Sequence, residues 1–203
     1  MDELISKAIS EKSYSYKEYI DMTEKLLSEG KTTGPDQSSE MIEYTKLNLV
    51  RMNRIEKTKG INEQLINSLS SLDKELIWLV ISEPWCGDAA NIVPVLAYIA
   101  DINEKINFRI ILRDENPEIM DRYLTNGGRA IPKLIIFDSI SGKELAVWGP
   151  RPATLQKEIN RIKSTPGYSI DELKKTIQLW YAENKTKDIQ SEILGLIKNL
   201  KNN

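Results

Sequence analysis

The segment Leu76-Ile-Trp-Leu-Val-Ile-Ser-Glu-Pro-Trp-Cys-Gly-Asp-Ala89 decides the fold class of this chain. Its first six residues are continuously apolar, which is typical of a strand buried on both faces of a sheet. Apolar residues then recur at helical spacing from about residue 87 to 102, and Phe108 to Leu112 has the pattern of a second strand. A strand, a helix and a strand in this order predict a right-handed parallel crossover.

The residues that follow extend the pattern to a mixed sheet. We expect a short helix from residue 117 to about 124, a third strand at 134–137 and a fourth strand at 144–148. Asp138 to Gly142 has the composition of the turn that joins the last two strands, and a helix at 153–163 closes the unit. The order indicates an α/β fold with a central mixed sheet of about four strands flanked by helices.

Helical patterns surround this unit on both sides. We expect helices at 16–29, at 38/39–57 (with Gly60 as a stop signal) and at 61–69, and two more after a linker at 164–167. The core-facing residues expected on the second of these helices are Met41, Tyr44, Leu47 and Ile55. The predicted organisation is an N-terminal helical extension packed on the core (1–75), the α/β core (76–164) and a C-terminal helical extension (165–203).

Composition excludes several classes of function. The chain of 203 residues has no histidine and one cysteine, which removes Ser-His-Asp and Cys-His catalysis, intrachain disulfides and metal sites built on histidine or several cysteines. The net charge of −2 and the scattered aromatic residues give no basis for nucleic-acid binding. No segment has the length and hydropathy of a membrane span or a signal peptide, so we expect a cytoplasmic protein. We also expect that the protein works without a metal or organic cofactor.

At Trp85-Cys-Gly-Asp-Ala89 the segment from about Leu76 to Lys163 resembles thioredoxin. The first strand runs into Trp85-Cys86-Gly87, and the next helix contains Pro94, eight residues beyond the cysteine. Asp114-Glu-Asn-Pro117 follows the second strand. These features occur in the order and at nearly the spacing of that family.

Two further features extend the resemblance. Ile131-Pro132 precedes the third strand, and Trp148-Gly149 ends the fourth. The N-terminal helices are similar to those of a bacterial thioredoxin-like subgroup. The resemblance implies a three-layer thioredoxin-like fold with extra N- and C-terminal helices. It also implies a cis Ile131-Pro132 bond beside the cysteine and an Ile131 backbone that pairs with an extended substrate peptide.

Cys86 is the candidate reactive group. A cysteine at a helix N-terminus faces unpaired N–H groups and the positive end of the dipole, which favour the thiolate. The alternative is a buried, inert small residue. The residues expected to form the site around it are Trp85, as a shield, Gly87, Asp88, Ala89, Ile131 and Pro132.

Charged residues near the predicted site have two interpretations each. Arg129 and Arg151 flank the site loops, and with Gly149 they are candidate contacts for an anionic peptide or a glutathione carboxylate. Asp88 is expected to be a helix-start residue, with proton transfer as the alternative. Three cations at helical spacing, Arg51, Arg54 and Lys57, form either a solvated face or a border of the site.

Four positions depart from the thioredoxin pattern. Ala89 stands where the resolving cysteine of dithiol thioredoxins is expected, so the chain cannot release a mixed disulfide by itself. Val80 and Ile110 stand where that family has a buried acid and its partner lysine. Asp88 replaces the usual proline and, as a carboxylate two residues from Cys86, tends to raise the pKa of the thiol.

Two functions remain open. In the first, the chain is a monothiol redox protein in which Cys86 exchanges with protein or peptide thiols and disulfides, and glutathione or a partner cysteine releases it. In the second, it is a non-catalytic module whose groove beside Pro132 binds an extended segment. Peroxide reduction through a sulfenic acid is a weaker third hypothesis, and the oligomeric state is undetermined.

Overall fold

A computed structural model describes residues 1–57 and 60–202. Its sheet contains β1 (Leu76–Ser82), β2 (Ile106–Leu112), β3 (Lys133–Asp138) and β4 (Glu144–Trp148) in the order β2-β1-β3-β4. β1 and β2 are parallel, and the other two pairs are antiparallel. The predicted α/β class with a four-stranded mixed sheet is confirmed.

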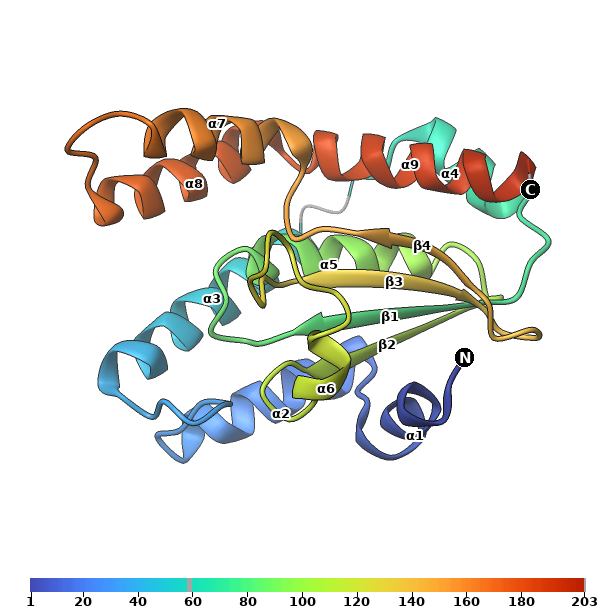
Figure 1. The fold of residues 1–203 in the computed structure, drawn as a ribbon, viewed down its shortest axis with the longest axis horizontal. Helices are drawn as coiled ribbons and strands as arrows, with labels where there is room; N and C mark the ends of the chain where they lie inside the picture. The colour runs from blue at the N-terminus through green and yellow to red at the C-terminus, as the bar shows by residue number, and fades with distance from the viewer. Residues whose placement is uncertain (58–59, 203) are drawn as a thin grey trace.

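Helices cover both faces of this sheet (Figure 1). They are α1 (Glu3–Lys12), α2 (Tyr16–Ser28), α3 (Ser39–Lys57), α4 (Glu63–Ser70), α5 (Ala89–Ala100), α6 (Pro117–Met120), α7 (Ala153–Lys163), α8 (Ile170–Asn184) and α9 (Lys187–Asn202). In Figure 1, α4, α7, α8 and α9 lie above the sheet, whereas α1 and α2 lie below it.

The larger core lies between one face of the sheet and α5. Every residue of α5 is buried, because α3 and α9 cover the side of α5 that faces away from the sheet. Side chains of α2, α4, α7 and α8 join the same cluster. All residues of β1 are buried as well, which agrees with its uninterrupted apolar sequence.

The second face of the sheet packs against α1 and α6. Ile5 and Ala8 of α1 and Ile119 and Met120 of α6 form one buried cluster with the alternate residues of β1 and β3. Helix α1 is absent from the sequence prediction. Its N-terminus is capped by Asp2, whose carboxylate accepts a hydrogen bond from the Ile5 N–H at 3.1 Å.

The predicted core face of α3 is wrong in part. Leu47 is 46% exposed, whereas Thr45 and Asn48 are buried. The two polar residues tolerate burial because each has a partner: Thr45 Oγ1 lies 2.6 Å from Thr32 Oγ1, and Asn48 Nδ2 donates to the Pro84 carbonyl at 2.9 Å. Of the four expected core residues, Ile55 alone is buried.

Other boundaries differ by a few residues. Helix α6 ends at Met120 rather than near Leu124, and α5 begins at Ala89 rather than near Gly87. Gly60, the predicted stop signal of α3, follows residues 58 and 59, which are outside the described residues. Within the described part of the chain, none of the helices combines the length and hydropathy needed to cross a bilayer.

Candidate active site

Cys86 lies in the tight turn between β1 and α5. Its N–H donates to the Glu83 carbonyl at 3.1 Å, and its carbonyl accepts from the Ala90 N–H at 3.1 Å, so the residue stands just before the first turn of the helix. Its Sγ lies 3.4 Å from the Ile131 carbonyl oxygen, and the Ile131–Pro132 peptide bond is cis. The thiol is therefore placed against the start of β3.

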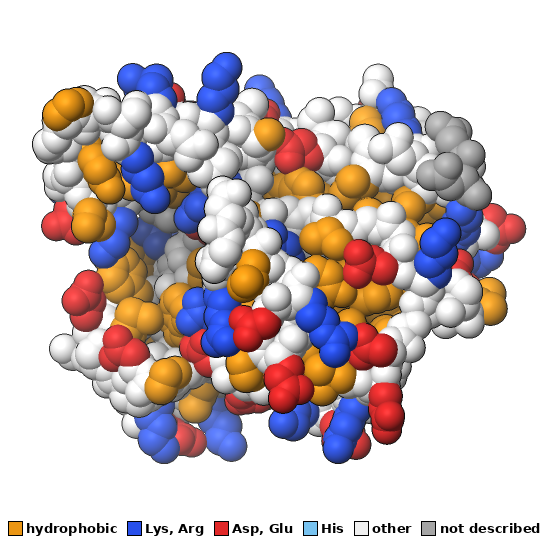
Figure 2. Space-filling model, in the orientation of Figure 1, with side chains coloured by type: hydrophobic (Ala, Val, Ile, Leu, Met, Phe, Trp, Pro, Cys, Tyr) orange, Lys and Arg blue, Asp and Glu red, His pale blue; other side chains and the backbone are white. Residues whose placement is uncertain are grey.

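The thiol also faces a groove of about 740 Å³. Trp85, Cys86 and Asp88 line its floor together with Arg151, while α3 and α8 supply its walls. Figure 2 shows this surface hollowed between α3 and α8, with Lys and Arg side chains around the hollow. Since both walls come from the helical extensions, the groove is built by the parts of the chain that surround the sheet.

Asp88 is a buried carboxylate held by two partners from distant segments. Its Oδ2 pairs with Arg151 Nη2 at 2.6 Å, and its Oδ1 accepts from the Tyr181 hydroxyl at 2.8 Å. Asp88 stands at the start of α5, as the sequence suggested, but its side chain makes no capping hydrogen bond to the helix backbone. Each of the two carboxylate oxygens therefore has a partner of its own, one from the β4–α7 connection and one from α8.

The surroundings of Cys86 act on its pKa in opposite directions. Burial raises the pKa of the thiol most, and the Asp88 charge raises it further, to about 12 from the ordinary value of 9.0. The N–H groups of Ala89 and Asp88 and the Arg151 charge lower this pKa, but they do not outweigh burial. The thiol is therefore protonated at neutral pH, contrary to the expectation from the helix N-terminus alone.

The neighbouring site residues are positioned by packing and backbone contacts. Trp85 lies under the Arg113 guanidinium, 4.6 Å from the ring centroid, so the ring is stacked rather than free. The Gly87 carbonyl accepts from Asn91 Nδ2 at 2.8 Å and from Gln178 Nε2 at 3.4 Å. Helix α8 is thus tied to the cysteine turn through the backbone.

The cations proposed from the sequence separate into two groups. Arg51 and Arg151 line the groove, whereas Arg129 pairs with Asp121 at 2.7 Å and is absent from the groove lining. Gly149 has a φ of +101° and directs its carbonyl at Lys133 Nζ, 3.0 Å away. Arg129 and Gly149 therefore contribute to the loops around the site, and Arg151 contributes to the groove itself.

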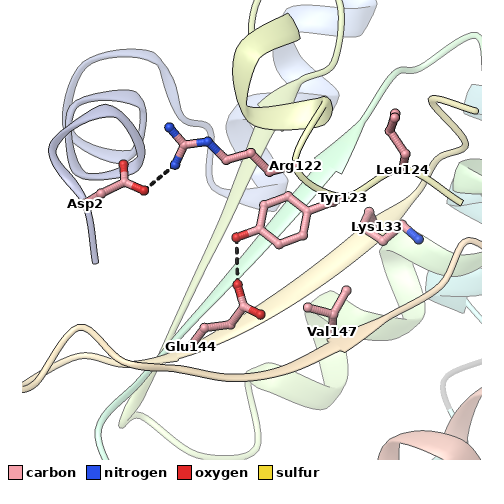
Figure 3. Close-up of a pocket in the computed structure, with 7 residues that line it drawn as sticks. All are labelled: Asp2, Arg122, Tyr123, Leu124, Lys133, Glu144 and Val147. Carbon is pink, nitrogen blue, oxygen red and sulfur yellow. Dashed lines mark hydrogen bonds and ion pairs between the residues drawn. The ribbon is translucent and has the colours of Figure 1, made fainter. Parts of the chain in front are cut away.

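A second pocket, of about 510 Å³, lies near the N-terminus (Figure 3). Its charged side chains are already paired: Arg122 with Asp2, and Tyr123 with Glu144 at 2.8 Å. Lys133 Nζ donates to Thr125 Oγ1 at 2.5 Å and to the Gly149 carbonyl. With its polar groups used internally, this pocket is a weaker candidate than the groove. Among the described residues, no group of three or more His, Cys, Asp or Glu side chains could hold a metal ion.

A comparison with models of known protein families identifies the family of this chain. The family model described as thioredoxin matches residues 34–164, which is more than half of the chain. The chain belongs to the thioredoxin family. The matched region begins before α3, so it includes one wall of the groove as well as the sheet.

Solved structures support the same fold. A protein of unknown function from Pseudomonas aeruginosa superposes with a TM-score of 0.56 at 16% identity, covering 92% of this chain and 99% of that one. An HIV epitope scaffold gives the same values. At this identity the likeness concerns the fold alone. No curated protein matches the sequence.

Within the thioredoxin fold, the interior near Cys86 is apolar at the positions that sequence analysis assigned to the family's acid and lysine. Val80 and Ile110 are partners in the β1–β2 register, and both are fully buried. Ala89 is also fully buried, in the first turn of α5. An unpaired acid or lysine would be costly in this apolar interior, and the aliphatic side chains avoid that cost.

Sequence reasoning missed several groups that the structure brings to the site. Glu83 is fully buried beside the cysteine turn, and Tyr181 and Gln178 reach the turn from α8. An acid directly before Pro84-Trp85-Cys86 was a visible signal for Glu83. The polar residues of α8 had no local signal, because their role depends on where that helix packs.

Proposed function

We propose that this thioredoxin-family protein is a monothiol exchange protein that works through Cys86. The main support is the position of Sγ, which faces a solvent-connected groove and lies 3.4 Å from the Ile131 carbonyl at the start of β3. In this arrangement a disulfide bound in the groove lies against the only thiol of the chain. The partners proposed are protein or peptide thiols and disulfides, with a cytoplasmic location as part of the same proposal.

The reaction has two exchange steps. Cys86 loses its proton to solvent, and the thiolate attacks one sulfur of a disulfide R–S–S–R′. The Cys86–S–S–R bond forms, the original S–S bond breaks, and R′–S⁻ leaves and takes up a proton. An external thiol then attacks the mixed disulfide, reduces Cys86 and leaves as a new disulfide. Two electrons pass from thiols to the original disulfide, and no resolving cysteine or metal is required.

The raised pKa of Cys86 shapes both steps. Because only the thiolate attacks, a thiol with a pKa of about 12 reacts slowly at neutral pH. A thiolate of high pKa is also a poor leaving group, so the mixed disulfide at Cys86 is released slowly. We therefore expect a long-lived adduct rather than rapid turnover.

The test is the pH dependence of mixed-disulfide formation by the folded protein. With oxidised glutathione as the probe, the adduct measured by intact mass should form about tenfold faster per pH unit from about pH 6 to pH 9, without a plateau. Cys86→Ser should form none. Asp88→Asn removes a charge that raises the pKa of Cys86, so it should lower the apparent pKa by about one unit and speed the reaction at pH 7.

A second candidate, the non-catalytic binding module, is favoured by the same raised pKa, since a protonated, half-buried thiol is a poor nucleophile. Here the groove binds an extended segment and Cys86 only packs against its floor. If the folded protein forms no adduct at about pH 9 while the urea-unfolded chain does, the exchange proposal is wrong and the binding module replaces it.

A further inference from the structure

Arg51 is a half-buried cation of the groove that has no carboxylate partner among the described residues. Arg51 lies on α3 and lines the groove beside the cysteine turn. Its Nη1 donates to the neutral Asn48 Oδ1 at 2.7 Å, and it forms no ion pair among the described residues. A half-buried guanidinium paired only with an amide has unused donors and an unneutralised charge.

Arg51 lies close to the turn that contains Cys86. Arg51 Nη1 lies 3.9 Å from the point where a Cβ on Gly87 would stand, one residue from Cys86. Burial and the neighbouring Arg54 charge lower the pKa of Arg51, which indicates a site where a bound anion would stabilise the guanidinium. Arg151, the other groove arginine, is already neutralised by Asp88.

The opposite wall adds charge of the same sign. Lys174 and Lys175 of α8 line the groove, and Lys174 Nζ reaches across to the Tyr44 hydroxyl of α3 at 3.0 Å. This contact links the two walls. Acids also line the groove, Glu40 and Asp171, but both are exposed, and neither forms an ion pair with a groove cation among the described residues.

The size of the groove limits the occupant. A groove of about 740 Å³ accommodates a small molecule or a few residues. The hydrogen bond between Lys174 and Tyr44 joins the two walls and restricts the access of a folded protein to the groove. The apolar side chains of Met41 and Ile177 line the same space and would cover the aliphatic part of such a compound. An anionic compound of this size that also contains sulfur fits both the charge and the thiol.

We propose that the groove binds a low-molecular-weight thiol that carries a carboxylate, with the carboxylate on Arg51 and the sulfur at Cys86. The inference rests on the proposed exchange function and names the small thiol in it. A protein mixed disulfide, protein–S–S–R, is attacked by the Cys86 thiolate at the sulfur of R, which forms Cys86–S–S–R and releases the protein thiol. A second molecule R–SH then reduces Cys86 and leaves as R–S–S–R.

The first experiment compares three disulfide probes of different charge: oxidised glutathione (anionic), bis(2-hydroxyethyl) disulfide (neutral) and cystamine (cationic). Adduct formation at Cys86, followed by intact mass, should favour oxidised glutathione over the neutral probe by about tenfold. Arg51→Met should abolish this preference and leave the neutral probe unaffected. Lys57→Met, which removes an exposed cation from the same helix outside the groove lining, should behave as the wild type. A preference that survives in Arg51→Met overturns the inference.

A second measurement separates the site from the exchange reaction. S-methylglutathione has carboxylates but no exchangeable sulfur, and its binding to Cys86→Ala can be followed by calorimetry. Binding that is weakened about tenfold in Cys86→Ala/Arg51→Met supports the inference even if no probe reacts with Cys86. Absence of binding, together with normal reaction of Cys86 with the neutral probe, contradicts the inference and leaves the exchange function standing.

Discussion

Glu83 is the residue whose surroundings differ most from those of an ordinary carboxylate. It is fully buried, its Oε1 accepts from the Asp114 N–H at 2.8 Å, and its Oε2 accepts from the Thr33 hydroxyl. Burial raises the pKa of this carboxyl to about 7 from 4.5, and the nearby Asp114 raises it further, whereas these hydrogen bonds and Arg113 lower it. Glu83 thus joins the segment before α3 to the end of β1, three residues from the thiol.

The pH dependence of stability should reveal this carboxyl. Between about pH 4.5 and 7 the folded state binds the Glu83 proton and the unfolded state releases it, so the free energy of unfolding falls as the pH rises. Across this pH range, Glu83 should lower the free energy of unfolding by about 3 kcal/mol. Urea unfolding at several pH values should show a smaller decrease in Glu83→Gln. The exposed Glu118→Gln serves as the control, and an unchanged decrease in Glu83→Gln would argue against the assignment.

At the scale of elements, the connection from β4 to α7 sets the position of Arg151. Gly149 has a φ of +101°, and a Cβ added there would stand 2.5 Å from the Pro132 carbonyl oxygen. The chain therefore approaches the Ile131-Pro132 segment as closely as glycine allows, and Arg151 follows two residues later. Helix α8 completes the arrangement by directing Tyr181 at the same Asp88.

Two glycine substitutions should have opposite effects on stability. Gly149→Ala combines an unfavourable φ with backbone overlap and should lower the free energy of unfolding by about 1–3 kcal/mol. Gly195 lies within α9, and a Cβ added there meets no atom within 4 Å. Gly195→Ala should therefore raise the free energy of unfolding by about 0.5–1 kcal/mol. Denaturant unfolding of the two variants beside the wild type checks both signs. A neutral Gly149→Ala would show that this connection can relax.

At the scale of the whole molecule, the terminal helices share one core with the sheet. Ile189, Ile193 and Ile197 of α9 are fully buried in the cluster that contains α5 and β1. Lys74 Nζ, before β1, donates to the Leu200 carbonyl at 2.7 Å, and the Gln190 side chain accepts from the Asn62 N–H at 2.8 Å. The extensions are therefore part of the structure that supports the groove.

Truncation of a buried side chain on α9 should destabilise the whole protein. Ile193→Ala should cost about 2–5 kcal/mol and shift a single unfolding transition, because the same core stabilises α9 and the sheet. Leu179→Ala, on the exposed face of α8, should change stability by less than about 0.5 kcal/mol. Two separate transitions detected by tryptophan fluorescence and circular dichroism would contradict a shared core.

Most elements were predictable because their signals are local. The apolar run of β1, the turn between β3 and β4 and the apolar spacing in α9 depend on neighbours within one element, and these predictions agree with the structure. The core face of α3 was not predictable, since burial of Thr45 and Asn48 depends on partners from other segments. Helix α1 was missed although the Asp2 cap is a local signal.

The amino-acid sequence by itself determined the order of the elements from α2 onward, the family and the presence of a single thiol. Periodicity, turn residues and the Trp85-Cys86-Gly87 spacing are sufficient for these. Only the tertiary structure decided the protonation of that thiol and the charges of its groove. Arg151 and Tyr181 reach Asp88 from 63 and 93 residues along the chain, and Arg51 approaches the turn from α3. Electrostatic effects depend on distance in space and on burial, and neither is encoded in local sequence spacing.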